Sequence, residues 1–188
     1  MAPQTIFFIG KPGSGKGTQA ELLAKATGWP VKVTSDGLRE IIAGGGKVGQ
    51  KLKETIDAGI LTPSWFPGYV FLKWLFALKE DEGVIFDGFN RKPAEAQLVT
   101  EALAWIGRPY VMLHLDVSDE EVRKRLSLRA QNSGRADDHA VDKRMEEYYG
   151  NTEGSIGYLR TTGKVIEING EGAVEDIAAA IRTALNLP

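Results

Sequence analysis

The stretch GKPGSGKGTQ, residues 10–19, follows the apolar run TIFFI at residues 5–9 and leads into the helix-like run TQAELLAKA. Gly10, four further residues, Gly15 and Lys16 have the spacing of a phosphate-binding loop between a strand and a helix. In such a loop, backbone N–H groups bind phosphate oxygens at a helix N-terminus, and glycines leave room for that approach. The strand before and the helix after favour this hypothesis over the alternative, a plain glycine-rich surface turn.

The composition indicates one globular domain. The chain has 188 residues, and 43% of them are hydrophobic, which is enough to build a core. Its 23 Lys and Arg against 25 Asp and Glu give a net charge of −2, which argues against a general nucleic-acid binder. The absence of cysteine excludes disulfides and thiolate metal sites. Because we find no signal peptide and no apolar run long enough to span a bilayer, we expect a cytoplasmic protein that binds neither nucleic acid nor membranes.

Strand-like runs alternate with helix-like runs along the chain. The strand-like runs are short, rich in β-branched or aromatic residues and apolar on both faces, which is typical of strands buried in a parallel sheet. They occupy residues 5–9, 31–34, 84–87, 110–116 and 164–168. Helices are expected at residues 17–28, over the stretch 47–80, at 93–107, at 118–131, over 137–162 and at 172–185. This alternation predicts an α/β doubly wound domain with helices on both faces of the sheet.

Several helix ends have recognisable signals. Ser118 followed by Glu121 forms a capping-box pattern, which satisfies backbone N–H groups at a helix start. Gly28 and Gly107 are expected helix stops, because glycine accepts the left-handed conformation that often ends a helix. We expect the aromatic-rich segment 64–79 to be a core helix, with a protein contact surface as the alternative.

The phosphate-binding loop has one unusual feature. Gly17 follows Lys16, so the hydroxyl of Thr18 stands one place later than the hydroxyl that often holds Mg²⁺. In this form GKPGSGKGTQ closely resembles the loop of adenylate kinases and the other nucleoside monophosphate kinases. Further segments resemble this family, in the family's own order: TSDGLRE (34–40), GQKLKETIDAGILTP (49–63), VIFDGFNR (84–91), RKRLSLRAQNSGRADD (123–138) and KRMEEYY (143–149). The resemblance covers nearly the whole chain.

The resemblance implies a P-loop NTPase-type doubly wound parallel sheet of about five strands, in a single domain over residues 1–188. The core would comprise residues 1–34, 64–129 and 139–188, with a small monophosphate-binding part at 35–63 and a short lid at 130–138. The implied reaction transfers the terminal phosphoryl group of Mg-ATP to a nucleoside monophosphate, AMP first of all. So short a lid has no room for a zinc-binding insertion, so the expected cofactor is Mg²⁺ and not zinc. We expect a monomer.

Phosphoryl transfer between two nucleotides brings two polyanions together, so the site needs cations from several elements and exclusion of water. Asp87 ends a strand-like run beside the loop, where a P-loop enzyme keeps a carboxylate for Mg²⁺ or its waters; a turn or helix-cap aspartate is the alternative. By resemblance, the catalytic residues are Lys16, Asp87, Arg91, Arg129, Arg135 and Arg144. The residues implied for ATP are Gly13, Ser14, Gly15, Lys16, Gly17, Thr18, Arg125, Arg129 and Gly172.

The residues implied for the monophosphate are Ser35, Arg39, Ile60, Leu61, Thr62, Gly88, Arg91, Glu95, Gln97, Arg135 and Arg144, with Thr34 as an alternative to Ser35. Adenylate kinases usually have a glutamine four residues after the arginine of their Asp-Gly-Phe-Pro-Arg motif. Here Glu95 takes that place, and the nearest glutamine is Gln97. A glutamine both donates and accepts at the edge of adenine, whereas a carboxylate only accepts. Glu95 therefore favours a base that presents donors, and CMP, UMP or another monophosphate is the alternative acceptor.

Two other departures from the family pattern concern single residues. Asn90 stands where the family usually has proline, and Thr62 where it usually has valine. They motivate a hypothesis of another class, a nucleotide-binding regulatory protein that has lost catalysis. The intact set of Lys16, Arg91, Arg129 and Arg135 argues against that hypothesis.

Overall fold

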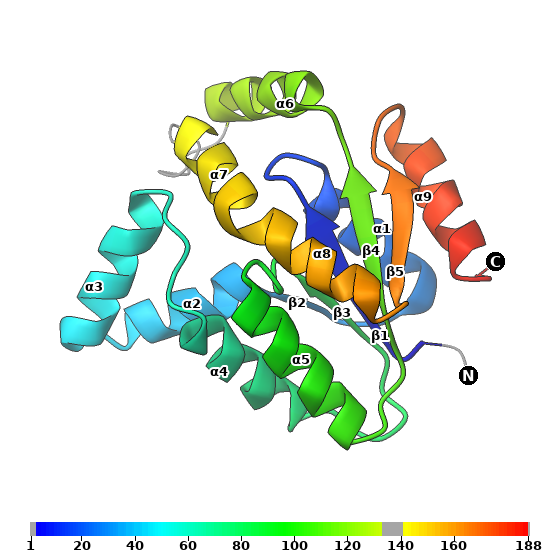
Figure 1. Cartoon of the computed structure of the whole chain (residues 1–188), viewed down its shortest axis with the longest axis horizontal. Coiled ribbons are helices and arrows are strands. Elements are labelled where there is room, and N and C mark those ends of the chain that lie inside the picture. The colour runs from blue at the N-terminus through cyan, green and yellow to red at the C-terminus, as the bar shows by residue number, and fades with distance from the viewer. Residues whose placement is uncertain (1–2, 133–140, 188) are drawn as a thin grey trace.

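A parallel sheet of five strands forms the centre of the molecule (Figure 1). The computed structural model describes residues 3–132 and 141–187. The strands are β1 (Thr5–Gly10), β2 (Val31–Val33), β3 (Val84–Asp87), β4 (Tyr110–Asp116) and β5 (Val165–Asn169). Their order is β2-β3-β1-β4-β5, and every neighbouring pair is parallel. The expected fold class and sheet are thereby confirmed.

The order of the strands creates a crevice beside β1. From β1 the chain goes to β2 and β3 on one side, and then to β4 and β5 on the other. In open α/β sheets, ligands bind outside the carboxyl ends of the strands at such a reversal. The phosphate-binding loop follows β1 at this point, so the topology alone places it in the crevice.

Helices cover both faces of the sheet. Successive β1 residues point to opposite faces, so Ile6 and Phe8 belong to one apolar cluster and Phe7 and Ile9 to the other. The first cluster packs against α1 (Lys16–Thr27) and α9 (Val174–Ala184), and the second against α4 (Trp65–Leu75), α5 (Pro93–Trp105) and α8 (Glu153–Thr161). The expected core helix within 64–79 is therefore confirmed as α4, whose Phe71 is fully buried.

The predicted elements needed correction between β2 and α4. The predicted strand 31–34 was one residue too long, because Thr34 begins α2 (Thr34–Ala43), a helix that the sequence did not suggest. Gly37 weakens the helical signal there, yet a Cβ on Gly37 would lie 2.3 Å from Val70 of α4, so close packing requires glycine. The stretch 47–80 contains two helices, α3 (Gly46–Asp57) and α4. Figure 1 shows α3 at the edge of the molecule, away from the sheet.

The last long helical region is also divided. It comprises α7 (Val141–Glu147), the π-helical turn η2 (Tyr148–Thr152) and α8. The helix α6 (Asp119–Asn132) precedes it in the chain. Gly28 and Gly107 have positive φ at the ends of α1 and α5, as predicted. Throughout the residues described, no helix combines the length and the apolar character that crossing a membrane requires.

Candidate active site

A cavity of about 650 Å³ lies at the carboxyl ends of β1 and β3. Its wall includes the phosphate-binding loop, the start of α2, the loop before α4, and residues of α5, α6 and α7. Most of the residues predicted for ATP and the monophosphate line it: Gly13, Ser14, Gly15, Lys16, Gly17, Thr18, Ser35, Ile60, Leu61, Thr62, Asp87, Gly88, Arg91, Glu95, Arg125, Arg129, Arg144 and Gly172. Segments far apart in the sequence thus meet in one concave site, as ligand sites require.

Backbone geometry explains the glycines of the phosphate-binding loop. Gly10 has φ 139°, and a Cβ there would lie 2.6 Å from the carbonyl oxygen of Leu115, so only glycine lets β1 end this close to β4. Gly15 is the N-cap of α1 in a left-handed conformation and provides no side-chain cap. The first N–H groups of α1 therefore remain available to a phosphate, which the helix dipole also favours.

Lys16 folds back over its own loop. Its Nζ donates to the carbonyl oxygen of Lys11 at 2.6 Å and to that of Gly10 at 3.0 Å. Burial lowers the pKa of Lys16 to about 8, although the nearby Asp87 carboxylate works in the opposite direction. The positive charges of Arg91, Arg144 and Arg129 contribute to this lowering. A site with so many cations around one ammonium is suited to a polyanion, whose charge stabilises all of them.

Asp87 lies beside the first turn of α1. A Cβ on Gly17 would be 3.6 Å from Oδ2 of Asp87, so this carboxylate lies in van der Waals range of the first turn of α1. A carboxylate oxygen next to bound phosphates is the kind of ligand that Mg²⁺ uses while keeping several waters. Residues 3–132 and 141–187 contain no cluster of three or more His, Asp or Glu that could hold a metal without a nucleotide. The residues present thus fit Mg²⁺ that arrives with ATP.

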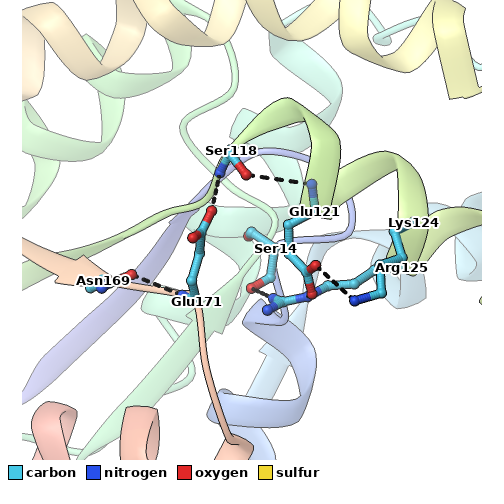
Figure 2. Close-up of polar contacts among 7 residues, drawn as sticks. All are labelled: Ser14, Ser118, Glu121, Lys124, Arg125, Asn169 and Glu171. Carbon is cyan, nitrogen blue, oxygen red and sulfur yellow. Dashed lines mark hydrogen bonds and ion pairs between the residues drawn. The ribbon is translucent and has the colours of Figure 1, made fainter.

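Arg125 lies over the phosphate-binding loop. Its Nη1 donates to the carbonyl oxygen of Ser14 at 3.3 Å, and its Nε donates to Oε1 of Glu121 at 2.8 Å (Figure 2). The planar guanidinium is therefore held between α6 and the loop, at the edge of the cavity. A flat cation in this position can stack on a nucleotide base.

The start of α6 is capped differently from the prediction. The backbone N–H of Glu121 does donate to Oγ of Ser118, at 3.4 Å. In a capping box, the side chain of Glu121 would in return accept from the backbone N–H of Ser118. Among the contacts in Figure 2, that N–H donates instead to Oε1 of Glu171, at 2.8 Å. Glu171 comes from the loop after β5, so it joins that loop, which also contains the cavity residue Gly172, to the start of α6. The capping-box prediction was thus half right.

Two predicted residues, Arg39 and Gln97, lie outside the cavity wall. Arg39 is exposed on α2, where it pairs with Asp36, and it does not belong to the cavity wall described above. Gln97 is exposed on α5 and is likewise outside that wall. Arg135 lies outside the described residues. Of the two candidates for reading the acceptor base, Glu95 is therefore the one that faces the cavity.

Glu95 is buried near the start of α5. Its Oε2 accepts a hydrogen bond of 2.9 Å from the backbone N–H of Arg91, and 4% of the residue is exposed. Burial raises the pKa of Glu95, although the bond from Arg91 and the charges of Arg91 and Lys92 reduce the effect. A carboxyl group that stays protonated can donate as well as accept, as a glutamine amide does.

Asn90 has a physical reason to replace proline. Its φ is 61°, which a proline ring cannot adopt but asparagine tolerates. The segment is held from α8 and η2, because Ser155 Oγ donates to the carbonyl oxygen of Asn90 at 2.7 Å and Thr152 Oγ1 to that of Arg91 at 3.0 Å. Gly88 completes the arrangement, since a Cβ there would lie 2.8 Å from Nη2 of Arg91. The replacement of the family's proline by Asn90 therefore occurs in a segment whose backbone, including that of Arg91, is held by hydrogen bonds.

Two contacts of the acceptor-side loop were missed from the sequence. Lys92 Nζ donates to the carbonyl oxygens of Thr62 at 2.9 Å and Leu61 at 3.3 Å. The N–H of Leu61 donates to Oε2 of Glu147 in α7, at 3.4 Å. No sequence pattern distinguishes Lys92 or Glu147 from other surface charges, so we see no signal that could have identified them.

Comparison with known proteins agrees with this geometry. A family model described as adenylate kinase matches residues 8–164. The chain is 40% identical to the adenylate kinase of Phocaeicola vulgatus, over 96% of this chain and 97% of that protein. It is 34% identical to the adenylate kinase of Thermus thermophilus, over 98% of each, and 34% identical to human adenylate kinase isoenzyme 1, over 96% of this chain and 93% of that protein. The chain belongs to the adenylate kinase family.

Proposed function

We propose that the protein is an adenylate kinase that transfers the terminal phosphoryl group of Mg-ATP to AMP and forms two ADP. The observation that carries this proposal is the shared cavity. The phosphate-binding loop with Lys16 forms one part of its wall, and Arg91, Arg129 and Arg144 reach it from three other segments. One of the earlier alternatives, a regulatory protein without catalysis, is not favoured, because Asn90 is compatible with a well-positioned Arg91.

In the proposed reaction, a phosphate oxygen of AMP forms a bond to the γ-phosphorus of ATP while the bond to the β-phosphate oxygen breaks. The loop N–H groups and Lys16 hold the ATP phosphates, and Arg91 is suited to the AMP phosphate. Arg129 and Arg144 neutralise the transferred group, because phosphoryl transfer depends mainly on positioning and charge stabilisation. Asp87 would hold Mg²⁺ through its waters, and the ion supplies further neutralisation of the phosphates.

The acceptor base is assigned to the region around Glu95. Ile60, Leu61 and Thr62 give this part of the cavity wall a largely apolar character, and Glu95 provides a buried carboxyl group. In its protonated form this group can donate to adenine and accept from it, whereas the ionised form only accepts. The comparisons favour adenine over the earlier alternatives, CMP and UMP.

A panel of acceptors tests the proposal. The purified chain is incubated with Mg-ATP and, separately, AMP, CMP, UMP or GMP, and the diphosphates formed are quantified. We expect AMP to give the highest kcat/KM. Transfer to none of the four would refute the kinase assignment, whereas a clear preference for CMP, UMP or GMP would refute AMP as the acceptor.

Two substitutions separate the candidates for reading the base. Glu95→Gln should raise the preference for AMP over CMP and GMP, because the amide always presents a donor. Gln97→Ala is the matched control and should leave the preference unchanged, because Gln97 lies on the exposed side of α5. If Glu95→Gln leaves the preference unchanged, or Gln97→Ala alters it, this assignment is wrong.

We also propose that the protein acts as a monomer in the cytoplasm. The absence of cysteine is compatible with a reducing compartment such as the cytoplasm. Light scattering during gel filtration should give a mass near the 20.5 kDa of one chain. A mass of twice that value at micromolar concentration would overturn the monomer.

A further inference from the structure

Lys11 occupies an unusual position in the phosphate-binding loop. It is the second residue of the loop, yet it is absent from the cavity wall that the described residues form. Its side chain, 14% exposed, reaches the start of α6 instead. There its Nζ donates to the carbonyl oxygen of Val117 at 2.9 Å and to Oδ1 of Asp119 at 2.6 Å.

A third segment meets the same carboxylate. Tyr149 Oη donates to Oδ1 of Asp119 at 2.6 Å, and Lys11 Nζ lies 5.7 Å from the centre of the Tyr149 ring. Tyr149 belongs to η2, the π-helical turn that follows α7. Such turns are frequent at functional sites. We call these three residues the Lys11–Asp119–Tyr149 cluster.

In the Lys11–Asp119–Tyr149 cluster, the charged forms of Lys11 and Asp119 stabilise each other. Hydrogen bonds from Lys11 and Tyr149 lower the pKa of Asp119, so its carboxylate remains ionised at neutral pH. Burial, the largest single effect, lowers the pKa of Lys11, but the hydrogen bonds and charges of Asp119 and Tyr149 together outweigh burial and raise this pKa. Charge-assisted bonds of this kind are stronger than neutral ones, and a half-buried lysine is less screened than a surface lysine.

The three segments that meet here also carry the cations of the cavity wall other than Arg91. The loop contains Lys16, α6 contains Arg125 and Arg129, and α7, which leads directly into η2, contains Arg144. Glu171 holds the start of α6 independently, through the N–H of Ser118 (Figure 2). Lys11 therefore bonds the loop directly to the start of α6, and Asp119 in turn bonds Tyr149 of η2, the turn that continues α7.

We propose that Lys11 is a positioning residue for phosphoryl transfer, which acts through Asp119 and Tyr149 to hold the phosphate-binding loop in register with α6 and α7. This inference rests on the proposed function. A small misplacement of groups that must surround one transferred phosphoryl group lowers the rate of the chemical step more than it lowers binding. Loss of the cluster should thus lower kcat and leave KM nearly unchanged.

Steady-state kinetics with Mg-ATP and AMP test the proposal. We expect Lys11→Met to lower kcat about tenfold and Tyr149→Phe about threefold, with KM for AMP changed less than twofold. Lys11→Arg should recover most of kcat, because a guanidinium can reach the same acceptors. Lys25→Met, at an exposed lysine of α1, is the matched control and should behave as the wild type.

The double variant shows whether the two residues act together. Residues of one network give non-additive effects, so Lys11→Met with Tyr149→Phe should be little slower than Lys11→Met alone. A wild-type kcat in Lys11→Met, or effects of the two substitutions that multiply fully, would overturn the proposal. If Lys11→Met does not fold, Tyr149→Phe with Asp119→Asn provides the same comparison.

Hydrogen exchange separates this inference from the proposed function. If the wild type transfers no phosphoryl group, the proposed function fails, but the cluster can still be examined without activity. Amides of residues 13–18 should exchange faster in Lys11→Met than in the wild type and in Lys25→Met, because the loop has lost its bonds to the start of α6. Unchanged exchange of these amides would contradict the role of Lys11 whatever the activity.

Discussion

The backbone N–H of Arg91 donates a 2.9 Å hydrogen bond to Oε2 of Glu95, so a residue suited to the acceptor phosphate and the carboxyl group near the acceptor base belong to one short unit. Glu95 follows Arg91 by four positions in the sequence. Because Glu95 is buried, any movement of this helix start changes both parts of the acceptor site together.

Glu95 should make the stability of the protein depend on pH. Burial raises the pKa of Glu95 above its ordinary value of 4.5, so the folded state binds more protons than the unfolded state between the two values. The contribution of Glu95 to the free energy of unfolding is therefore greatest below pH 4.5 and falls as the pH rises through the raised pKa. Glu95→Gln removes this dependence.

Urea denaturation of the wild type and Glu95→Gln from pH 4 to pH 8 measures the effect. Taking the difference between the two proteins cancels the other titrating groups. We expect Glu95→Gln to gain stability relative to the wild type as the pH rises. A difference that stays constant over the range would show that the pKa of Glu95 is not raised.

Gly88→Ala should impair the acceptor site. Gly88 has φ 84°, and a Cβ there would lie 2.8 Å from Nη2 of Arg91, so the guanidinium must move. We expect a loss of about 1–3 kcal/mol of stability from backbone strain. We also expect a roughly tenfold lower kcat/KM for AMP from the displaced Arg91. Gly107→Ala is the control for strain alone, because Gly107 also has positive φ but follows the end of α5 and has open space at its Cβ position. Equal kinetic effects of the two substitutions would contradict the displacement of Arg91.

Arg108 should matter for stability and not for catalysis. It is buried at the opposite end of the sheet, where Nε donates to Oγ1 of Thr5 at 2.7 Å and Nη2 donates to the carbonyl oxygens of Gln4, at 3.4 Å, and Glu82. Arg108→Met leaves these acceptors without their donor, which should cost about 1–3 kcal/mol. Urea denaturation gives the loss, and kcat should remain that of the wild type. A stable variant, or one with a changed kcat, would refute this role.

Much of the fold and many of the cavity residues could be predicted from the sequence. Particular residues show why the rest could not. The phosphate-binding loop from Gly10 to Lys16 could be predicted because all of its signals are close together in the chain. These signals are the spacing of its glycines and lysine, the strand before it and the helix after it. The apolar runs at β1, β3 and β4 predicted strands because a strand buried on both faces needs no polar alternation, whereas β2 and β5 are partly exposed edge strands. The helix α2 was missed because Gly37 is chosen by packing against Val70, a contact that sequence does not reveal.

The side-chain contacts that the sequence did not predict also join residues that are far apart in the chain. Glu171 took the place that the capping-box pattern gave to Glu121, and it lies some fifty residues away in the chain, in the loop after β5. Lys11 reaches Asp119, and Glu147 reaches Leu61, from segments that are still farther away in the chain. Local patterns predict which groups a helix start needs, but the tertiary fold decides which residue supplies them.

The most direct test of the central claim compares the wild type with Lys16→Met in a single assay of Mg-ATP and AMP, with thermal melting as the check on folding. We expect the wild type to form two ADP for each ATP consumed. Lys16→Met should be at least about a hundredfold slower, because it lacks the ammonium at the centre of the cation cluster. Its melting temperature should stay close to that of the wild type. A wild type that forms no ADP from this pair, or a folded Lys16→Met that is as fast as the wild type, would contradict the account.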